Sequence, residues 1–385
     1  MWHAVVRRGI VDDALRAVDV DGTLLVGGAI AVVLLGGIWL VIRWLRRTPG
    51  HQFQRLLGQY DSVDVLMHPN PDPDAMSAAL AVSFLADTVD TDANLLFAGQ
   101  IRHQENRAFR TVLDVDLTRI ESAAELEGDA LVLVDHNRPR GFSGAEGLSP
   151  DALIDHHPGG GEAESFTDAR TNYGACATIL AEYLQEIGAQ PAGNDEEIDL
   201  PIPWEVSTGL LYGIQSDTNH LTKGCTPAEF DAASYLFPGI DEDALDRIAN
   251  PEVSAETLEI KARAIRDRRI MGSFAVADVG EISNVDAIPQ AAEELLTLEG
   301  VTAVVVYGKR EGELNLSGRS RDDRVHMGDV LAAVTDDIPM ASAGGHARMG
   351  GGQISIAHME GIGPWEGLTE EQFADRLFSA MSGDI

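Results

Sequence analysis

Short apolar runs alternate with longer helical segments over much of the chain. Residues 62–68, 129–137 and 151–160 each contain a continuous apolar run, which is typical of strands buried in a parallel sheet. Residues 75–89 combine small and apolar side chains, as helices packed on such a sheet do, and residues 205–221 predict a further helix that ends in a turn. This alternation predicts an α/β fold built on a parallel sheet.

One apolar segment near the N-terminus has a different character. Residues 23–42 contain no charged side chain over 20 positions, which as a helix is enough to cross a hydrocarbon core of about 30 Å. Three arginines follow within residues 43–47, and basic flanks stay on the cytoplasmic side. We therefore expect a single-pass membrane protein with a cytoplasmic body. A buried core helix is the alternative.

Composition adds information about size, environment and partners. The 385 residues suffice for two domains, and 62 acidic against 28 basic residues give a net charge of −34. Only three of the basic residues are lysines, a composition typical of proteins from a high-salt cytoplasm, so we expect a haloarchaeal source. The charge would repel a long nucleic acid, so a nucleic-acid substrate should be short. Cys176 and Cys225 form neither a zinc motif nor a disulfide framework.

Carboxylates and imidazoles gather where the predicted elements end, in four separate segments. In the first, "HPNPDPDAM", three prolines stiffen the backbone after a strand, where open α/β sheets place their sites. One Asp in such a position is usually a turn or cap residue, but so many together would repel one another without cations. Oxygen and imidazole ligands without thiolates favour Mn²⁺, with Mg²⁺ as the alternative. The candidate residues are His68, Asp72, Asp74, Asp135, His136, Asp155, His156, His157 and Asp217.

These segments resemble those of a known family. "HPNPDPDAM", "VLVDHN", "LIDHH" and "GIQSDT" are similar, in order and spacing, to the four catalytic motifs of the DHH phosphoesterase superfamily. "LNLSGRSRDD" and "SAGGHARMGGG" resemble elements of its C-terminal DHHA-type domain, although Ala343 stands where the family has a glycine. The resemblance covers residues 52–385. It implies a phosphodiesterase or phosphatase that uses two Mn²⁺ ions.

The resemblance also implies roles for individual residues. One metal would be held by His68, Asp72 and Asp135, and the other by Asp74, Asp135, His156 and Asp217. His157 would face the substrate phosphate, with Asp155 orienting the histidines. The substrate clamp would consist of Arg319, Gly344, Gly345 and His346. Glycines let backbone amides approach an anion closely, and arginine adds a bidentate charge.

The expected organisation follows from these assignments. Residues 254–270 have helical periodicity and would link the two domains, which in two-domain members of the family bind substrate in the cleft between them. Residues 353–358 predict a strand. The expected parts are an N-terminal tail (1–22), a transmembrane helix with its basic flank (23–47), a DHH catalytic domain (52–250), a linker helix (251–270) and a smaller α/β DHHA-type domain (271–385).

Several substrates and partners remain open at this point. The first motif most resembles the branch that degrades very short RNAs and dephosphorylates 3′-phosphoadenosine 5′-phosphate, so the expected partner is short single-stranded RNA or a small nucleotide. Membrane-anchored relatives hydrolyse cyclic di-AMP, which is the first alternative. A non-catalytic nucleotide sensor is an alternative of another class, whereas a processive RecJ-like exonuclease is disfavoured by the acidic surface. Further expectations are attachment to the membrane through residues 23–42 and a homodimer.

Two other segments carry weaker signals. In residues 99–109, His103, Asn106 and Arg107 recur at about one-turn spacing, for which we favour a solvated helix face over a substrate-facing one. The acidic residues 192–200 predict an exposed loop.

Overall fold

The computed structural model describes residues 48–101, 103–193, 198–322, 324–362 and 367–384. These residues form two compact units. The first holds residues up to Ile101 together with Glu105–Ala249, and the second consists mainly of Asn250–Ile385. Each unit is described by itself.

The first unit is built on a six-stranded sheet with the order β3-β2-β1-β4-β5-β6. All neighbouring strands in it run parallel, as the continuous apolar runs predict. The strands are β1 (Ser62–Leu66), β2 (Asp92–Phe97), β3 (Thr118–Arg119), β4 (Ala130–Val134), β5 (Ala152–Asp155) and β6 (Phe166–Ala169). A separate parallel pair is formed by β7 (Gln190–Pro191) and β8 (Pro201–Ile202).

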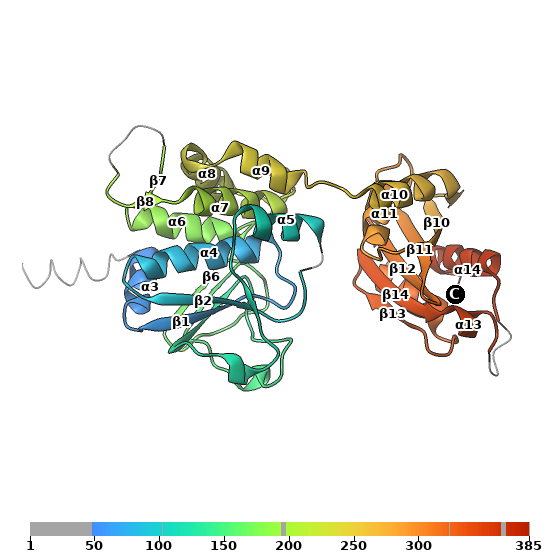
Figure 1. Cartoon of the computed structure of the whole chain (residues 1–385), viewed down its shortest axis with the longest axis horizontal. Helices are drawn as coiled ribbons and strands as arrows, with labels where there is room; N and C mark the ends of the chain where they lie inside the picture. Colours follow the sequence, from blue (N-terminus) through green and yellow to red (C-terminus); the bar gives the residue numbers. More distant parts are fainter. Residues whose placement is uncertain (1–47, 102, 194–197, 323, 363–366, 385) are drawn as a thin grey trace, which may run out of the picture. The chain divides into compact units, whose positions relative to one another are not determined.

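Helices cover one face of this sheet (Figure 1). Apolar residues of α4, α6 and α7 form the main core with the strands, and α4 is buried along most of its length. Small side chains such as Ala78, Ala79 and Ala81 allow this close packing. The helices are α3 (Pro49–Leu57), α4 (Pro73–Asp87), α5 (Gln104–Val112), α6 (Cys176–Glu186), α7 (Trp204–Asp217), α8 (Pro227–Leu236) and α9 (Glu242–Ala249), with a short 3-10 turn, η3 (Phe237–Gly239).

The other face of the sheet has a smaller core. Leu66, Leu133 and Leu153 pack there against residues of the irregular segments between strands, including Phe142 and Leu148. These segments contain the 3-10 turns η1 (Ala123–Glu125) and η2 (Ala145–Gly147). The sheet is therefore covered by helices on one side and by loops on the other.

The register of the central strands sets the position of the candidate ligands. Leu66 of β1 is opposite Leu133 of β4, and Val134 of β4 is opposite Ile154 of β5. The three strands therefore finish at nearly the same level, and the residues that follow them lie at one edge of the sheet.

The second unit contains a six-stranded mixed sheet with the order β13-β14-β12-β11-β10-β9. Only β10 and β11 are parallel neighbours within it. Its strands are β9 (Arg269–Met271), β10 (Phe274–Glu281), β11 (Ala303–Arg310), β12 (Glu313–Ser320), β13 (Ser342–Gly345) and β14 (Met349–Ser355). Its helices are α10 (Ala255–Asp267), α11 (Ala287–Leu296), α12 (Met327–Thr335), α13 (Ile356–Met359) and α14 (Glu370–Ser382).

Two cores stabilise this unit, one on each side of its sheet. The first includes residues of α12 and α14, and the second residues of α10 and α11. Ile260 and Ala264 of α10 are fully buried in the second core. The helix expected to link the domains is thus an integral part of the second unit.

The expectation of a single-pass membrane protein has to be corrected. Among the residues that the structure describes, no helix is long and apolar enough to cross a membrane. The longest, α4, has 15 residues and would reach only about 22 Å of the roughly 30 Å required. Residues 23–42, on which the expectation rested, lie outside the described residues, as do residues 194–197 of the predicted acidic loop. We do not retain the membrane location.

Candidate metal centre

Two groups of Asp and His side chains meet at the carboxyl edge of the first sheet. In the first group, His68 follows β1 and its Nε2 atom lies 3.5 Å from Asp72 Oδ2 and 3.5 Å from Asp135 Oδ2. Asp72 is the N-cap of α4, and its Oδ1 accepts a hydrogen bond from Ala75 N at 3.1 Å. The loop between β1 and α4 thus presents a His and an Asp to the aspartate that follows β4.

The second group surrounds His156, which follows β5. Its Nε2 atom lies 3.3 Å from Asp135 Oδ1, 3.4 Å from Asp217 Oδ2 and 3.6 Å from Asp74 Oδ2. Its other ring nitrogen, Nδ1, lies 3.2 Å from the carbonyl oxygen of Tyr173, which holds the ring in this orientation. Four elements therefore contribute to this group.

Asp135 is common to both groups, with one carboxylate oxygen directed to each. Its Oδ1 atom is buried without a hydrogen-bond partner, as is His156 Nε2. Its backbone is left-handed, with φ of 61°, and its amide donates to the carbonyl oxygen of Ile154 at 2.9 Å. This conformation costs about 1–2 kcal/mol for a residue with a Cβ atom, although Asp and Asn adopt it more readily than others. The chain turns sharply at this position and directs the carboxylate inward.

Asp74 is fixed by the start of α6. Its carboxylate accepts hydrogen bonds from the amides of Cys176 and Ala177, both at 2.7 Å. These amides belong to the first turn of a helix, where free N–H groups and the helix dipole stabilise an anion. Gly213 lets α7 approach α4 closely, because a Cβ atom on Gly213 would lie 2.3 Å from Ser77 Oγ and 3.2 Å from Asp74 Cα. Asp217 is the last residue of the same helix.

Electrostatics show how strongly the cluster favours positive charge. Burial, followed by the charge of Asp217, raises the pKa of Asp74 to about 8. Burial and the charge of Asp74 likewise raise the pKa of Asp135 well above its usual range. Burial would lower the pKa of His156, but the nearby carboxylates of Asp135 and Asp217 outweigh it and raise this pKa to about 11. The buried carboxylates thus retain protons unless cations take their place.

His157 and Asp155 form a pair beside the cluster. His157 Nδ1 lies 2.9 Å from Asp155 Oδ1, whereas the His157 side chain is 47% exposed and that of Asp155 only 1%. Burial would raise the pKa of Asp155, but the hydrogen bonds from His157 outweigh it and lower this pKa. Because Asp155 accepts at Nδ1, Nε2 is the ring nitrogen of His157 that is left for a ligand or substrate. His136, by contrast, is buried, and burial lowers its pKa to about 4, which keeps the ring neutral.

The donor set fits divalent cations. Asp135, His156 and His157 are close enough to share an ion, as are His68, Asp72 and Asp135, and Asp74, His156 and Asp217. Buried carboxylates with unpartnered ligand atoms indicate that positive charge belongs here. Oxygen and imidazole donors suit Mn²⁺ or Mg²⁺ rather than a metal that prefers thiolates. All six predicted metal ligands are therefore brought together.

Asn106 supports the candidate centre, and the expectation that it lies on a solvated helix face is wrong. It is buried rather than solvated, and its Nδ2 atom donates to the carbonyl oxygen of Pro71 at 3.0 Å. This bond holds the loop that carries Asp72. Arg107 is exposed, as expected for a solvated face. His103 is also exposed, but it precedes α5 and is among the residues that line the pocket of the second unit. Asn106 differs from its exposed neighbours because α5 packs against this loop, and the sequence carries no signal for that packing.

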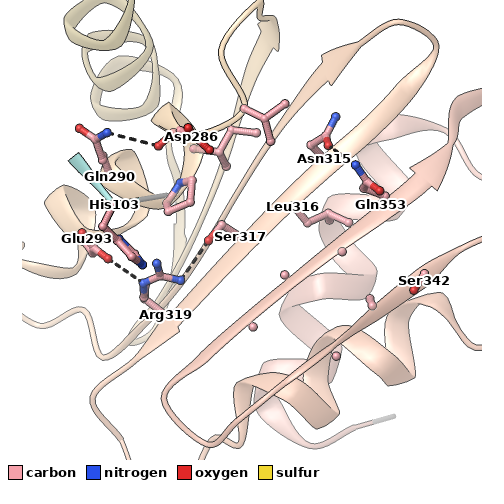
Figure 2. A pocket seen from close by; sticks show the side chains of 18 of the residues that line it. His103, Asp286, Gln290, Glu293, Asn315, Leu316, Ser317, Arg319, Ser342 and Gln353 are labelled. Atoms are coloured by element: carbon pink, nitrogen blue, oxygen red, sulfur yellow. Dashed lines mark hydrogen bonds and ion pairs between the residues drawn. The ribbon is translucent and has the colours of Figure 1, made fainter. Parts of the chain in front are cut away.

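The predicted substrate clamp lies in the second unit and is only partly assembled around one pocket. The pocket, of about 570 Å³, is lined by Arg319 and Gly344, whereas neither Gly345 nor His346 is among its lining residues. Figure 2 shows Arg319 beside Glu293 and Ser317. Arg319 Nε lies 3.0 Å from Glu293 Oε1, and Arg319 Nη1 donates to Ser317 Oγ at 3.1 Å.

The alanine that replaces the family's glycine is accommodated within a strand. Ala343 lies in β13 opposite Gly352 of β14. A Cβ atom on Gly352 would lie 2.5 Å from the Ala343 Cβ atom, so the two residues share the space of one methyl group. Gly345 has φ of 153° and a Cβ there would lie 2.3 Å from Met349 O, so this position requires glycine.

The domains found in the structure match two known families of domains. Residues 62–214 match the N-terminal domain of the DHH family, and residues 271–362 match the DHHA1 domain. The chain therefore belongs to the DHH/DHHA1 phosphoesterase family, whose members are metal-dependent hydrolases.

Three curated proteins with similar sequences show which activities are named among the relatives of this chain. An uncharacterized protein of Methanocaldococcus jannaschii is 33% identical over 305 residues, covering 79% of this chain and 60% of that protein. The cyclic-di-AMP phosphodiesterase GdpP of Geobacillus thermodenitrificans is 29% identical over 360 residues, covering 88% of this chain and 50% of that protein. A probable manganese-dependent inorganic pyrophosphatase of Lactiplantibacillus plantarum is 30% identical over 172 residues, covering 44% of this chain and 52% of that protein. The chain thus spans between 50% and 60% of the length of these relatives.

Proposed function

We propose that this protein is a Mn²⁺-dependent hydrolase that cleaves the phosphodiester bonds of small nucleotides. The observation that carries the proposal is the shared carboxylate of Asp135, which faces His68 with one oxygen and His156 with the other. Such an arrangement would let the residues on either side of Asp135 each hold a cation. When bound, two divalent cations neutralise charge on a phosphate and lower the pKa of water.

The protein's own residues would then divide the remaining tasks. Asp74, fixed by the amides of Cys176 and Ala177, and Asp135, fixed by its backbone turn, hold the ligand geometry before substrate binds. Asp155 accepts the Nδ1 proton of His157, so the Nε2 atom of this exposed ring donates to a phosphate oxygen when the ring is doubly protonated. Arg319 in the second unit is a cationic side chain suited to bind an anionic group of a nucleotide.

Cyclic di-AMP is the first candidate substrate, because the similarity to the cyclic-di-AMP phosphodiesterase extends over 88% of this chain and so includes both domains. Short oligoribonucleotides and 3′-phosphoadenosine 5′-phosphate form the second group, which the residues of the loop from His68 to Asp74 favour through their resemblance to that branch. A nucleotide sensor without turnover is the alternative of another class.

A product-resolved assay tests the proposal. The purified protein with Mn²⁺ is offered cyclic di-AMP, short RNAs and 3′-phosphoadenosine 5′-phosphate, with bis-(p-nitrophenyl) phosphate as a substrate that lacks a base. We expect cyclic di-AMP to be opened to a linear dinucleotide. Binding of nucleotide and Mn²⁺ without any cleaved product would instead identify a sensor.

The conditions of this assay follow from composition. With 62 acidic and 28 basic residues, we propose that the protein works in a concentrated salt solution, where screening reduces repulsion between carboxylates. Activity should therefore rise with potassium chloride concentration. The homodimer stays a prediction, which the mass of the protein in solution tests in the same preparation.

A further inference from the structure

The pocket of the second unit has a polar end opposite to Arg319 that the proposed catalytic roles leave unused. Asn315, Ser317 and Arg319 alternate along β12, so their side chains share one face of the sheet. Asn315 and Arg319 are four residues apart, about 13 Å along the strand. This is comparable to the extent of a nucleoside monophosphate from its phosphate to the far edge of its base. Figure 2 shows both ends of the pocket.

Two amide side chains form the polar end. Asn315 is paired across the strands with Gln353 of β14, and Gln353 Nε2 donates to Asn315 Oδ1 at 3.0 Å. Asn315 is only 4% exposed, whereas Gln353 is exposed. Among the described residues, neither Asn315 Nδ2 nor Gln353 Oε1 has a hydrogen-bond partner. The pair therefore presents one free donor next to one free acceptor.

This pattern does not depend on how the two amides are oriented. If both amides are rotated by half a turn, Asn315 donates to Gln353 and leaves an Asn315 oxygen and a Gln353 nitrogen free. Either arrangement leaves one donor and one acceptor, because each amide uses one group on the other. The side chains also hold each other in place, which reduces the entropy lost when a ligand binds.

Beside the Ser317 side chain, the floor between the two ends is bare backbone. Gly344 of β13 and Gly351 of β14 are cross-strand neighbours, and Gly351 is opposite Ser317. A Cβ atom on Gly344 would meet nothing within 4 Å, and one on Gly351 would meet only Leu316 O, at 3.5 Å. Side chains at these positions would therefore project into open space. Their absence leaves a flat surface on which a planar ring can lie.

We propose that the Asn315–Gln353 amide pair recognises the edge of an adenine base of the substrate, with Arg319 at the phosphate end. Adenine presents the 6-amino donor beside a ring-nitrogen acceptor on both its Watson–Crick and its Hoogsteen edge. Guanine presents two acceptors on its Hoogsteen edge, so it matches the pair from one side only. This inference rests on the proposed function, since it names the base by which that function would select its nucleotide.

The test compares substrates that differ only in the 6-amino group. The purified protein with Mn²⁺ is given linear dinucleotides of adenine, of purine, which lacks this group, and of guanine. We expect the kcat/KM for the adenine dinucleotide to exceed that for the purine dinucleotide about 10–100-fold, the effect of one bidentate contact. The double variant Asn315→Leu/Gln353→Met should bring this ratio close to one.

Two further variants secure the interpretation. Gln353→Glu changes an exposed side chain and leaves only acceptors at the pair, so it should lower kcat/KM for the adenine dinucleotide about tenfold even if the double variant does not fold. Gln290→Met removes another amide of the same pocket, one that donates to Asp286 O at 3.3 Å, and should keep the preference for adenine.

The outcomes separate this inference from the proposed function. Equal kcat/KM for all three dinucleotides, a preference for guanine, or an adenine preference that survives in the folded double variant would overturn the adenine assignment while leaving nucleotide hydrolysis intact. An unchanged kcat/KM in Gln353→Glu would overturn it as well. Cleavage of bis-(p-nitrophenyl) phosphate with no cleavage of any nucleotide would refute the proposed function itself.

Discussion

Replacing Asp135 by asparagine removes one carboxylate from both candidate metal-binding groups at once. Asparagine has nearly the same size and also adopts a left-handed backbone, so the turn after β4 should be kept. The carboxylate charge that faces His68 and His156 is lost, while the other five candidate ligands remain in place. The variant therefore isolates the contribution of the shared charge to metal binding and turnover.

The expected magnitude follows from the number of groups affected. Loss of a residue that merely orients a metal ligand weakens metal binding about 10–100-fold. Asp135 lies within ligand distance in two groups, so at least two such factors multiply. We therefore expect kcat/KM to fall by about 10²–10⁴, or ~3–5.5 kcal/mol at ~1.4 kcal/mol per tenfold.

The assay combines hydrolysis of bis-(p-nitrophenyl) phosphate with the Mn²⁺ content of the dialysed protein. Asp114→Asn is the matched control, because Asp114 also has a left-handed backbone, with φ of 51°, but is exposed on a turn. It should retain full activity and Mn²⁺ content. Two bound Mn²⁺ ions and wild-type turnover in Asp135→Asn would refute the reasoning that the shared carboxylate holds the centre together.

Three further predictions concern the surroundings of the centre. Removing Mn²⁺ with a chelator should lower the thermal unfolding midpoint of the first unit by about 5–11 °C. The reason is that one bound ion, at a free concentration of about 100 times its dissociation constant, adds ~2.7 kcal/mol to the free energy of unfolding. An unchanged midpoint would exclude a tightly held ion. Gly213→Ala should lower the free energy of unfolding by about 1–3 kcal/mol in urea, because the alanine methyl group would lie 2.3 Å from Ser77 Oγ. Adding Ser77→Gly to the same chain should recover part of this loss. Asn106→Ala leaves the carbonyl oxygen of Pro71 without its hydrogen-bond donor, so we expect the free energy of unfolding to fall by about 1–3 kcal/mol. Calorimetry should also show weaker Mn²⁺ binding. Equal Mn²⁺ affinity would show that this bond does not support the ligand loop.

The parallel sheet and its ligands could be predicted from the sequence for a simple reason. Buried parallel strands are continuous apolar runs, and residues that follow such strands must meet at one edge. The prolines after His68 also set the start of α4 close to its predicted position, with Asp72 as the N-cap. Local signals were sufficient to group these candidate ligands because each of them lies at or near one end of a helix or strand.

Contacts between distant segments could not be predicted in the same way. The amides that hold Asp74 come from the start of α6, 102 and 103 residues further along the chain. The amide pair of Asn315 and Gln353 depends on the register of β12 against β14, which alternation alone does not fix. The resemblance placed His346 in the substrate clamp, but it is not among the residues that line the pocket.

The left-handed backbone of Asp135 limits which sequences could descend from this one after loss of activity. A β-branched or bulky side chain at this position would strain the turn between β4 and the ligand edge, whatever happened to the chemistry. A relative that had become a pure nucleotide sensor should therefore carry Asn or Gly at this position rather than Val, Ile or Thr. Such a replacement would distinguish a sensor from an active hydrolase by inspection of one residue, and a functional survey of relatives that differ there would check it.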